Sequence, residues 1–243
     1  MGNVRRNTAL MQLWYGIKDG IPIALGYLSV SFSFGIMAVE GGLTWYEATM
    51  ISVFNTTSAG QVAGLSIMLM HGSLIEMAVT QFVINLRYSL MAISLSQNVN
   101  KGVKTFYRLF FGAMITDEVF AVAVSKVYKV GRGYLVGLQG VAFLGWALGT
   151  FFGAVLGGVL PEAVTSALGL ALYGMFIAIF VPTSRTDRRV AIVVLIAILL
   201  SCAFTYVPVI NSISSGFAVI ISAIAASLFG TFFLPGNEKK EAA

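Results

Sequence analysis

The stretch SLIEMAVTQFVINLRYSLMAISLSQN, residues 73–98, is apolar along most of its length and carries Arg87 near its middle. Its one other charged residue is Glu76, close to one end. A spanning helix needs about 20 predominantly apolar residues, so this stretch is long enough to cross a bilayer. In a helix, Arg87 would lie about 21 Å from Ser73 and about 16 Å from Asn98, near the middle of the membrane.

The whole chain has the composition of an integral membrane protein. Of its 243 residues, 58% are hydrophobic and only 10% are charged, whereas soluble domains carry about 25% charged residues. Stretches such as VAIVVLIAILLSCAF (190–204) lack the alternation of apolar and polar residues that a transmembrane barrel requires. Because the bilayer core offers no water to backbone groups, spanning elements of this kind are helices. We therefore predict an all-α, polytopic membrane protein.

Eight apolar segments are candidates for membrane segments. Short loops join them, and no linker indicates a second domain. We expect a cytoplasmic N-terminal segment (1–20), a single transmembrane domain (21–234) and a cytoplasmic C-terminal tail (235–243). The eight candidate segments are 21–39, 47–70, 74–97, 106–126, 134–160, 164–182, 190–207 and 213–234.

Lys and Arg are concentrated in a few loops, so the net charge of +5 indicates membrane topology rather than nucleic-acid binding. If all eight segments span, the cluster Lys101, Lys104 and Arg108 lies outside, against the positive-inside rule. The conflict disappears if 47–70 and 106–126 each enter and leave by the same face. These two segments are also the most polar, and many transporters build substrate sites from broken helices. We predict seven or eight membrane segments, with these two discontinuous.

Arg87 needs a partner, because an arginine at the bilayer centre costs at least about 2.5 kcal/mol and stays charged. Asp117 and Glu118, in GAMITDEVFAVAV (112–124), lie near the middle of their own segment. Adjacent residues point about 100° apart on a helix, so one acid can pair with Arg87 while the other faces a cavity or another helix. Such a pair either fixes helix packing or takes part in transport and coupling, and we favour the second role.

Amide and hydroxyl side chains accompany these charges. Gln81 and Asn85 are four residues apart, on one face of the helix that carries Arg87. A second group interrupts the segment 47–70. Such side chains either bond neighbouring helices, at about 0.6 kcal/mol each, or bind a zwitterion. The candidate substrate-binding or coupling residues are Arg87, Asp117, Glu118, Asn85, Gln61, Gln81, Asn55, Thr57 and Ser58.

Residues for covalent or metal chemistry are scarce. Cys202 is the only cysteine and His71 the only histidine, so neither a metal cluster nor a nucleophile–base pair is expected. The chain has no phosphate-binding loop of the form GxxxxGK[ST], so we expect no ATP hydrolysis. We predict no enzymatic activity, cofactor or metal, and transport that draws on the proton gradient through an intramembrane carboxylate.

Small residues recur at four-residue spacing at Gly145, Gly149 and Gly153. In lipid, close backbone approach at small residues helps helices to associate. We prefer this packing role to a place on the substrate path. Trp146 lies deeper than the aromatics expected at the membrane interface and is a candidate to line a cavity.

Four motifs resemble those of the AzlC family in order and spacing. The similarity runs from about residue 16 to the basic loop near residue 189. Its most specific part is NLRY followed by TDE, inside a chain this apolar. The glycine–proline pair at the start of the first motif would be weak evidence for the family by itself. The motifs are GIKDGIPIALGYLSVSFSFGIMA (16–38), SAGQVAGL (58–65), NLRYSLMA (85–92) and TDEVFA (116–121).

The resemblance implies a secondary exporter of branched-chain or other small apolar amino acids, multi-pass in the cytoplasmic membrane of a bacterium. It implies a small four-helix AzlD-type membrane subunit as partner. The other expected partners are the amino acid substrate, protons and membrane lipid, and no nucleic acid is expected. Tyr88 stands where many relatives have His, and FNTTSAGQ (54–61) where many read FAGAAQ, so a more polar substrate stays open. The alternative is an ion channel or scaffold subunit without its own amino acid path. The family's signature positions fall at Gln61, Asn85, Arg87, Asp117 and Glu118.

Overall fold

The chain divides into two compact units. The first comprises Met1–Val62 and Ile84–Leu172, and the second comprises Ala63–Val83 and Tyr173–Ala243. The structure is a computed structural model. It describes residues 9–161, 163–164, 167, 170, 174, 177, 181–182, 184–208, 210 and 212–233.

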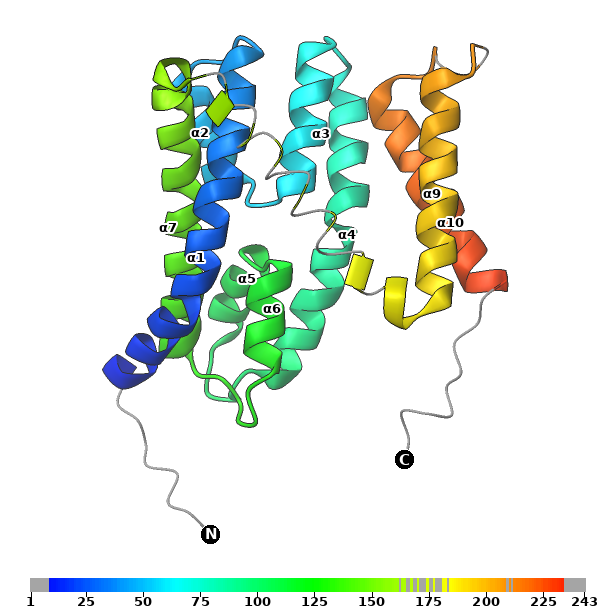
Figure 1. Ribbon diagram of the computed structural model, residues 1–243. Helices are drawn as coiled ribbons and strands as arrows, with labels where there is room; N and C mark the ends of the chain where they lie inside the picture. The colour runs from blue at the N-terminus through cyan, green and yellow to red at the C-terminus, as the bar shows by residue number, and fades with distance from the viewer. Residues whose placement is uncertain are drawn as a thin grey trace. The chain divides into compact units, whose positions relative to one another are not determined.

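Helices account for nearly all of the regular structure in the described residues, where the only strand-like pairing is one isolated bridge between Val99 and Val130. This confirms the predicted all-α class. The helices, labelled in Figure 1, are α1 (Ala9–Glu40), α2 (Trp45–Phe54), α3 (Ser58–Leu69), α4 (Leu74–Asn98), α5 (Thr105–Ala113), α6 (Asp117–Val124), α7 (Arg132–Leu156), the short 3-10 helix η1 (Gly157–Val159), α9 (Arg188–Tyr206) and α10 (Ser215–Phe233).

Five helices of the described chain are long and apolar enough to cross a membrane, namely α1, α4, α7 with η1, α9 and α10. The predicted count of seven or eight segments is therefore not reached within these residues. Most of the predicted segment 164–182 lies outside the described residues, as do the predicted tail 235–243 and the first eight positions. Helix α1 begins at Ala9, well before the predicted start at 21, so much of the expected N-terminal segment is helical.

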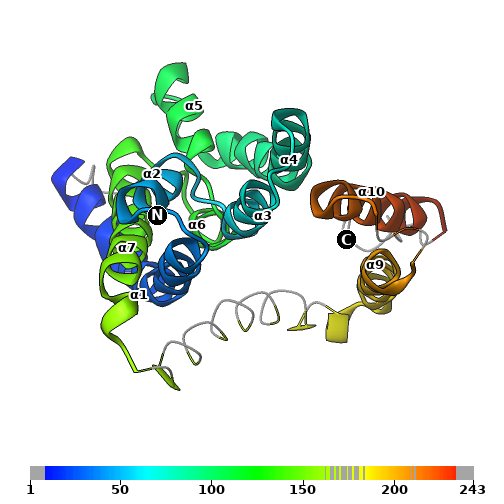
Figure 2. The same ribbon diagram turned by 90° about the horizontal axis from the view of Figure 1, so that it is seen from above.

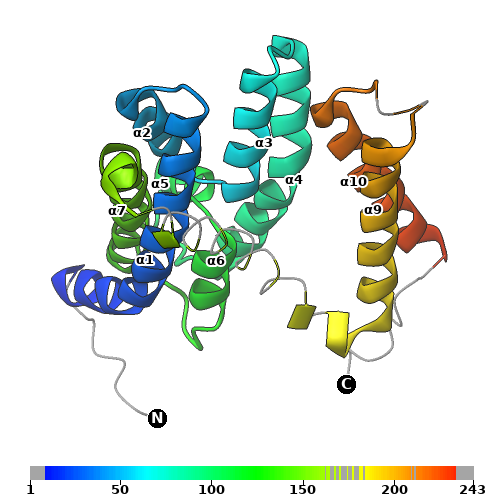
Figure 3. The same ribbon diagram turned by 45° about the horizontal axis from the view of Figure 1, so that its top comes forward.

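Helices α1 and α7 form the core of the first unit and run parallel. Gly145 of α7 abuts Ala24 of α1, and eight residues further along both helices Gly153 abuts Phe32. A methyl group added at Gly145 would lie 2.5 Å from the Ala24 carbonyl oxygen, so the backbones touch where glycine permits it. The predicted packing role of the small residues is thus observed. Figure 3 shows α2 beside α7 as well, where Trp45 packs edge-on against Phe151.

Both segments predicted to be discontinuous are broken in the structure. Residues 55–57 separate α2 from α3, and residues 114–116 separate α5 from α6. At the first break Asn55 is extended, with φ −134° and ψ 96°. At the second, Thr116 is extended and caps α6, its hydroxyl accepting a bond from the Val119 N–H. Each break leaves some backbone groups without the partner that a continuous helix would give them.

The α5–α6 pair begins and ends at the same place. Asn100 N donates to Val130 O at 2.9 Å, and Val130 N donates to Asn98 O at 3.1 Å. The segment before α5 is therefore hydrogen-bonded to the segment after α6. A segment whose two ends meet in this way cannot cross the bilayer. Figure 1 shows α6 beside α1.

This return of the chain resolves the conflict with the positive-inside rule. The basic clusters at 101–108 and 126–132 flank the α5–α6 pair and therefore lie on one face. Lys126 also pairs with Asp19 of α1 at 2.7 Å, so this part of α1 lies near the same face. The same-face prediction for 47–70 stays a prediction, because α3 passes from the first unit into the second.

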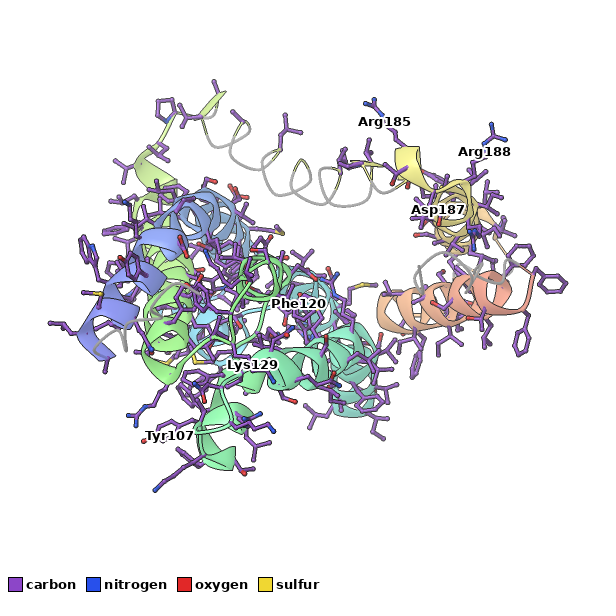
Figure 4. The ribbon with its side chains drawn as sticks, turned by 90° about the horizontal axis from the view of Figure 1, so that it is seen from below. Tyr107, Phe120, Lys129, Arg185, Asp187 and Arg188 are labelled. Atoms are coloured by element: carbon purple, nitrogen blue, oxygen red, sulfur yellow. The ribbon has the colours of Figure 1, made fainter. Side chains whose placement is uncertain are left out.

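In the second unit, the start of α4 is bonded to the start of α10. Glu76, at the start of α4, is buried, and its carboxylate accepts a bond from Gly216 N at 3.0 Å, so it caps α10. Helix α9 packs along α10 (Figure 2), with Val193 against Gly230. At and just before the start of α9, the side chains of Arg188 and Arg185 extend away from the chain (Figure 4), as expected for a basic surface segment.

Candidate functional site

Arg87 of α4 is paired with an acid of α6. Its Nη2 lies 2.9 Å from Asp117 Oδ2, and the same nitrogen donates to the Tyr88 hydroxyl at 2.8 Å. The side chains of Arg87 and Asp117 are 46% and 30% exposed in the isolated chain. The pair therefore ties α4 to α6 while remaining open on one side. Asp117 is one of the two partners that the sequence offered for Arg87.

Glu118 points to a different helix. Its Oε2 accepts a hydrogen bond from the hydroxyl of Tyr27 on α1. Tyr27 is buried, and its ring meets Trp146 of α7 edge-on at 5.2 Å between centroids. The two adjacent acids thus reach separate partners, in keeping with their angular separation on a helix. Both lie in the first turn of α6, where the helix dipole favours negative charge.

Gln61 closes the break between α2 and α3. Its Nε2 donates to the Asn55 carbonyl oxygen at 2.7 Å and to Ser52 Oγ at 2.8 Å. The Ser52 hydroxyl in turn bonds Thr150 of α7 at 2.6 Å. Gln61 is 1% exposed. In this way a side chain satisfies the carbonyl that the helix break leaves without its usual donor.

The same break is joined to α4. Thr57 Oγ1 donates to Asn85 Oδ1 at 2.6 Å, so a break residue contacts the helix that carries Arg87. Ser58 begins α3 directly after the break. Gln81 belongs to the second unit, where its Nε2 donates weakly to Met77 Sδ at 3.9 Å. Of the candidates from the sequence, only Gln81 falls in the second unit.

A cavity of about 620 Å³ lies between the two helix breaks and α4. This volume is in the range of sites that hold small organic molecules. Its polar wall combines break residues with Asn85, Tyr88 and Ser89 of α4, and its apolar wall includes Ile93 and Leu109. Tyr88 connects the cavity to the ion pair, because it lines the cavity and also contacts Arg87.

Arg108 is a cavity residue that the sequence analysis assigned only to a topology cluster. Its guanidinium donates to three backbone carbonyls, those of Val103 at 3.0 Å, Ser96 at 2.6 Å and Asn100 at 2.9 Å. It thereby fastens the end of α4 to α5 and lines the cavity at that end. The available signal was its position inside the apolar stretch TFYRLFFGA, rather than in the loop before it.

Ser52, Thr150 and Tyr27 also escaped the sequence analysis, because single hydroxyls in apolar helices are common packing residues. Trp146 was expected to line a cavity, and it is buried against one. Within the described ranges, no three His, Cys, Asp or Glu side chains gather closely enough to hold a metal ion.

Interrupted helices around a polar cavity, in a chain with several spanning helices, define a multi-pass membrane protein of the transporter-like class. The chain belongs to the AzlC family: the family model described as AzlC protein matches residues 22–160. This confirms the resemblance drawn from the motifs.

Related proteins agree with the membrane assignment. The chain is 26% identical over 184 residues to the inner membrane protein YgaZ of Escherichia coli K12, covering 73% of this chain and 75% of that protein. It is 29% identical over 172 residues to an uncharacterized membrane protein of Archaeoglobus fulgidus, with coverages of 70% and 75%. A membrane protein of Helicobacter pylori 26695 is 23% identical over 226 residues, with coverages of 89% and 88%. No solved structure matches the chain.

Proposed function

We propose that this chain is the large permease subunit of a secondary, proton-coupled exporter of branched-chain or other small apolar amino acids. The observation that carries the proposal is the cavity of about 620 Å³ between the two helix breaks. An apolar amino acid has charged ammonium and carboxylate groups and an apolar side chain. A site for it needs polar groups at one wall and apolar groups at another, and this cavity has both.

The polar wall suits a zwitterion. The amides of Asn55 and Asn85 each offer donors and an acceptor, so they can receive both the ammonium and the carboxylate group. Many transporters build their substrate sites at helix breaks of this kind. Phe54, Ile93 and Leu109 also line the cavity and offer apolar surface to a branched aliphatic side chain.

The Arg87–Asp117 pair supplies a means of coupling. It bridges α4, which walls the cavity, and α6, which follows the second break. When Asp117 takes up a proton its attraction to Arg87 is lost, and the two helices are free to separate. Loss of the proton restores the pair. An ionisable residue inside the membrane commonly marks such a proton or ion pathway.

The proposal also includes a setting and a partner. We place the exporter in the cytoplasmic membrane of a bacterium, supported by the inner-membrane description of the Escherichia coli relative. We assign it a small four-helix AzlD-type subunit as partner, which remains part of the proposal.

Leucine efflux tests the proposal. Cells that express the chain with its four-helix partner are loaded with a leucine peptide, and leucine release is followed for Arg87→Ala and Asp117→Asn. Each variant is expected to lower efflux at least about tenfold, equivalent to about 1.4 kcal/mol. Arg185→Ala, at an exposed position before α9, is the matched control and is expected to keep the normal rate.

Two outcomes would count against it. Unchanged efflux in both site variants, at normal expression, contradicts the coupling mechanism. Ion current without amino acid flux, in vesicles that contain both subunits, favours the channel alternative.

A further inference from the structure

A second, much smaller cavity lies beside the first. About 10 Å³ of it is accessible to the centre of a water molecule, which is roughly the space that one water needs. Thr56, in the break between α2 and α3, lines both cavities. Tyr27, Gln139 and Trp146 line the small cavity from α1 and α7, and Thr116 lines it from the second break.

Two buried polar atoms at this cavity have no hydrogen-bond partner among the described residues. They are Trp146 Nε1, a donor, and Gln139 Oε1, an acceptor. The two residues are only 2% and 3% exposed. The amide nitrogen of Gln139 already donates to the Phe111 carbonyl oxygen at 2.9 Å, which fixes the orientation of the amide and leaves its oxygen free. A buried polar atom of this kind is destabilising if it stays unbonded.

One water molecule would satisfy both atoms. It would accept from the indole N–H and donate to the amide oxygen, with hydroxyl groups of Tyr27, Thr56 and Thr116 as further partners on the cavity wall. Two to four polar partners are what a buried water requires. A metal cation fits less well, because the indole N–H would direct a partial positive charge toward it.

The small cavity is also connected to an acid. Tyr27 lines it and donates its hydroxyl hydrogen to Glu118. Thr56 belongs to the walls of both cavities. The order of groups is therefore Glu118, Tyr27, small cavity, Thr56 and large cavity.

We propose that the small cavity holds one water molecule that relays protons between the large cavity and Glu118. Tyr27 passes its hydroxyl proton to the Glu118 carboxylate and takes one from the relay water, which is replenished through Thr56. Every oxygen along the path gives one proton and receives one, so only Glu118 changes its charge. Trp146 and Gln139 hold the water in position. This inference rests on the proposed proton-coupled function and adds to it Glu118, a second acid that takes up a proton beside Asp117.

Transport assays separate the relay from the function on which it rests. The full chain and its four-helix partner are placed in vesicles, and two leucine fluxes are measured, one driven by a proton gradient and one by exchange without a gradient. Trp146→Phe and Gln139→Leu are expected to lower the driven flux about tenfold, equivalent to about 1.4 kcal/mol, and to leave exchange unchanged. Trp14→Phe, at an exposed tryptophan, is the control.

The outcomes are distinct. If the normal protein exchanges leucine but ignores the proton gradient, the proposed coupling fails. If the normal protein is coupled and both variants remain fully coupled, the relay is wrong while the exporter stands.

A spectroscopic measurement does not depend on transport. The chain has three tryptophans, so Trp14→Phe with Trp45→Phe leaves Trp146 alone. The ultraviolet resonance Raman band that reports indole N–H bonding is expected at the hydrogen-bonded position. A band at the position of a free N–H would overturn the water site, whatever the variants do in transport.

Discussion

At the scale of single residues, Gln61 illustrates how a broken membrane helix stays stable. The sequence marked it as a candidate because an amide inside an apolar run is costly unless bonded. Its bonds to Asn55 and Ser52 show what it does in the fold. The sequence could not reveal that Ser52 and Thr150 complete the network, because their pairing depends on how α2 lies against α7.

Gln61→Leu is expected to lower the free energy of unfolding by about 1–3 kcal/mol, because the buried Asn55 carbonyl loses its donor. Thermal unfolding of the purified protein in detergent measures the effect. Gln97→Leu, at an exposed position of α4, is the matched control and is expected to be neutral. Equal stability of the two variants would refute the structural role of Gln61.

The pairing of the charged residues was only partly predictable from the sequence. From the sequence, Arg87 required an acid at the same depth, and two adjacent acids qualified. Only the structure distinguishes them, giving Asp117 to Arg87 and Glu118 to Tyr27. The choice depends on the rotation of α6 about its axis, which local spacing does not determine. Their roles in transport stay predictions.

At the scale of helices, the polar stretches and the misplaced basic cluster were enough to predict two interrupted segments. The exact breaks follow local rules that the sequence also carries. Thr116 caps α6 through its hydroxyl, and Thr44 with Glu47 forms a capping box at the start of α2. The boundaries of α1 were missed, because residues 9–20 mix polar and apolar side chains yet continue the helix.

Glycine positions in α7 lead to a test of helix packing. Gly145→Ala places a methyl group 2.5 Å from the Ala24 carbonyl oxygen, so α1 and α7 must separate, at a cost of about 1–3 kcal/mol. Gly140→Ala meets no atom within 4 Å and serves as control. It is expected to be neutral or slightly stabilising, by up to about 1 kcal/mol of helix propensity.

Apparent melting temperatures of the two variants in detergent, read by size-exclusion chromatography after heating, provide the comparison. A Gly145→Ala protein as stable as Gly140→Ala would show that the α1–α7 contact is not tight.

For the molecule as a whole, the return of α5–α6 to its starting face has a consequence for topology. With α1 and α7 parallel and their N-terminal ends on the face of the basic clusters, α4 must bring the chain back to that face. The segment 47–70 is then expected to begin and end on the opposite face, which stays a prediction.

Cysteine labelling in intact cells tests this topology. In a Cys202→Ser chain, Glu40→Cys and His71→Cys are expected to react with an impermeant reagent added outside. Lys101→Cys and Tyr128→Cys are expected to be protected until the membrane is opened. All four positions are exposed on the protein surface, so access depends on the side of the membrane. Labelling of Lys101→Cys from outside would support eight full spans.

The sequence by itself determined the membrane class, the two interrupted segments and the need for an acid beside Arg87. These follow from composition, segment length and the cost of charge in lipid, which are properties of short stretches. Only the tertiary structure decided that α1 and α7 run parallel, that the ends of the α5–α6 pair are bonded, and that both breaks meet at cavities. Those features depend on contacts between residues far apart in the chain, whose register is set by close packing at small side chains.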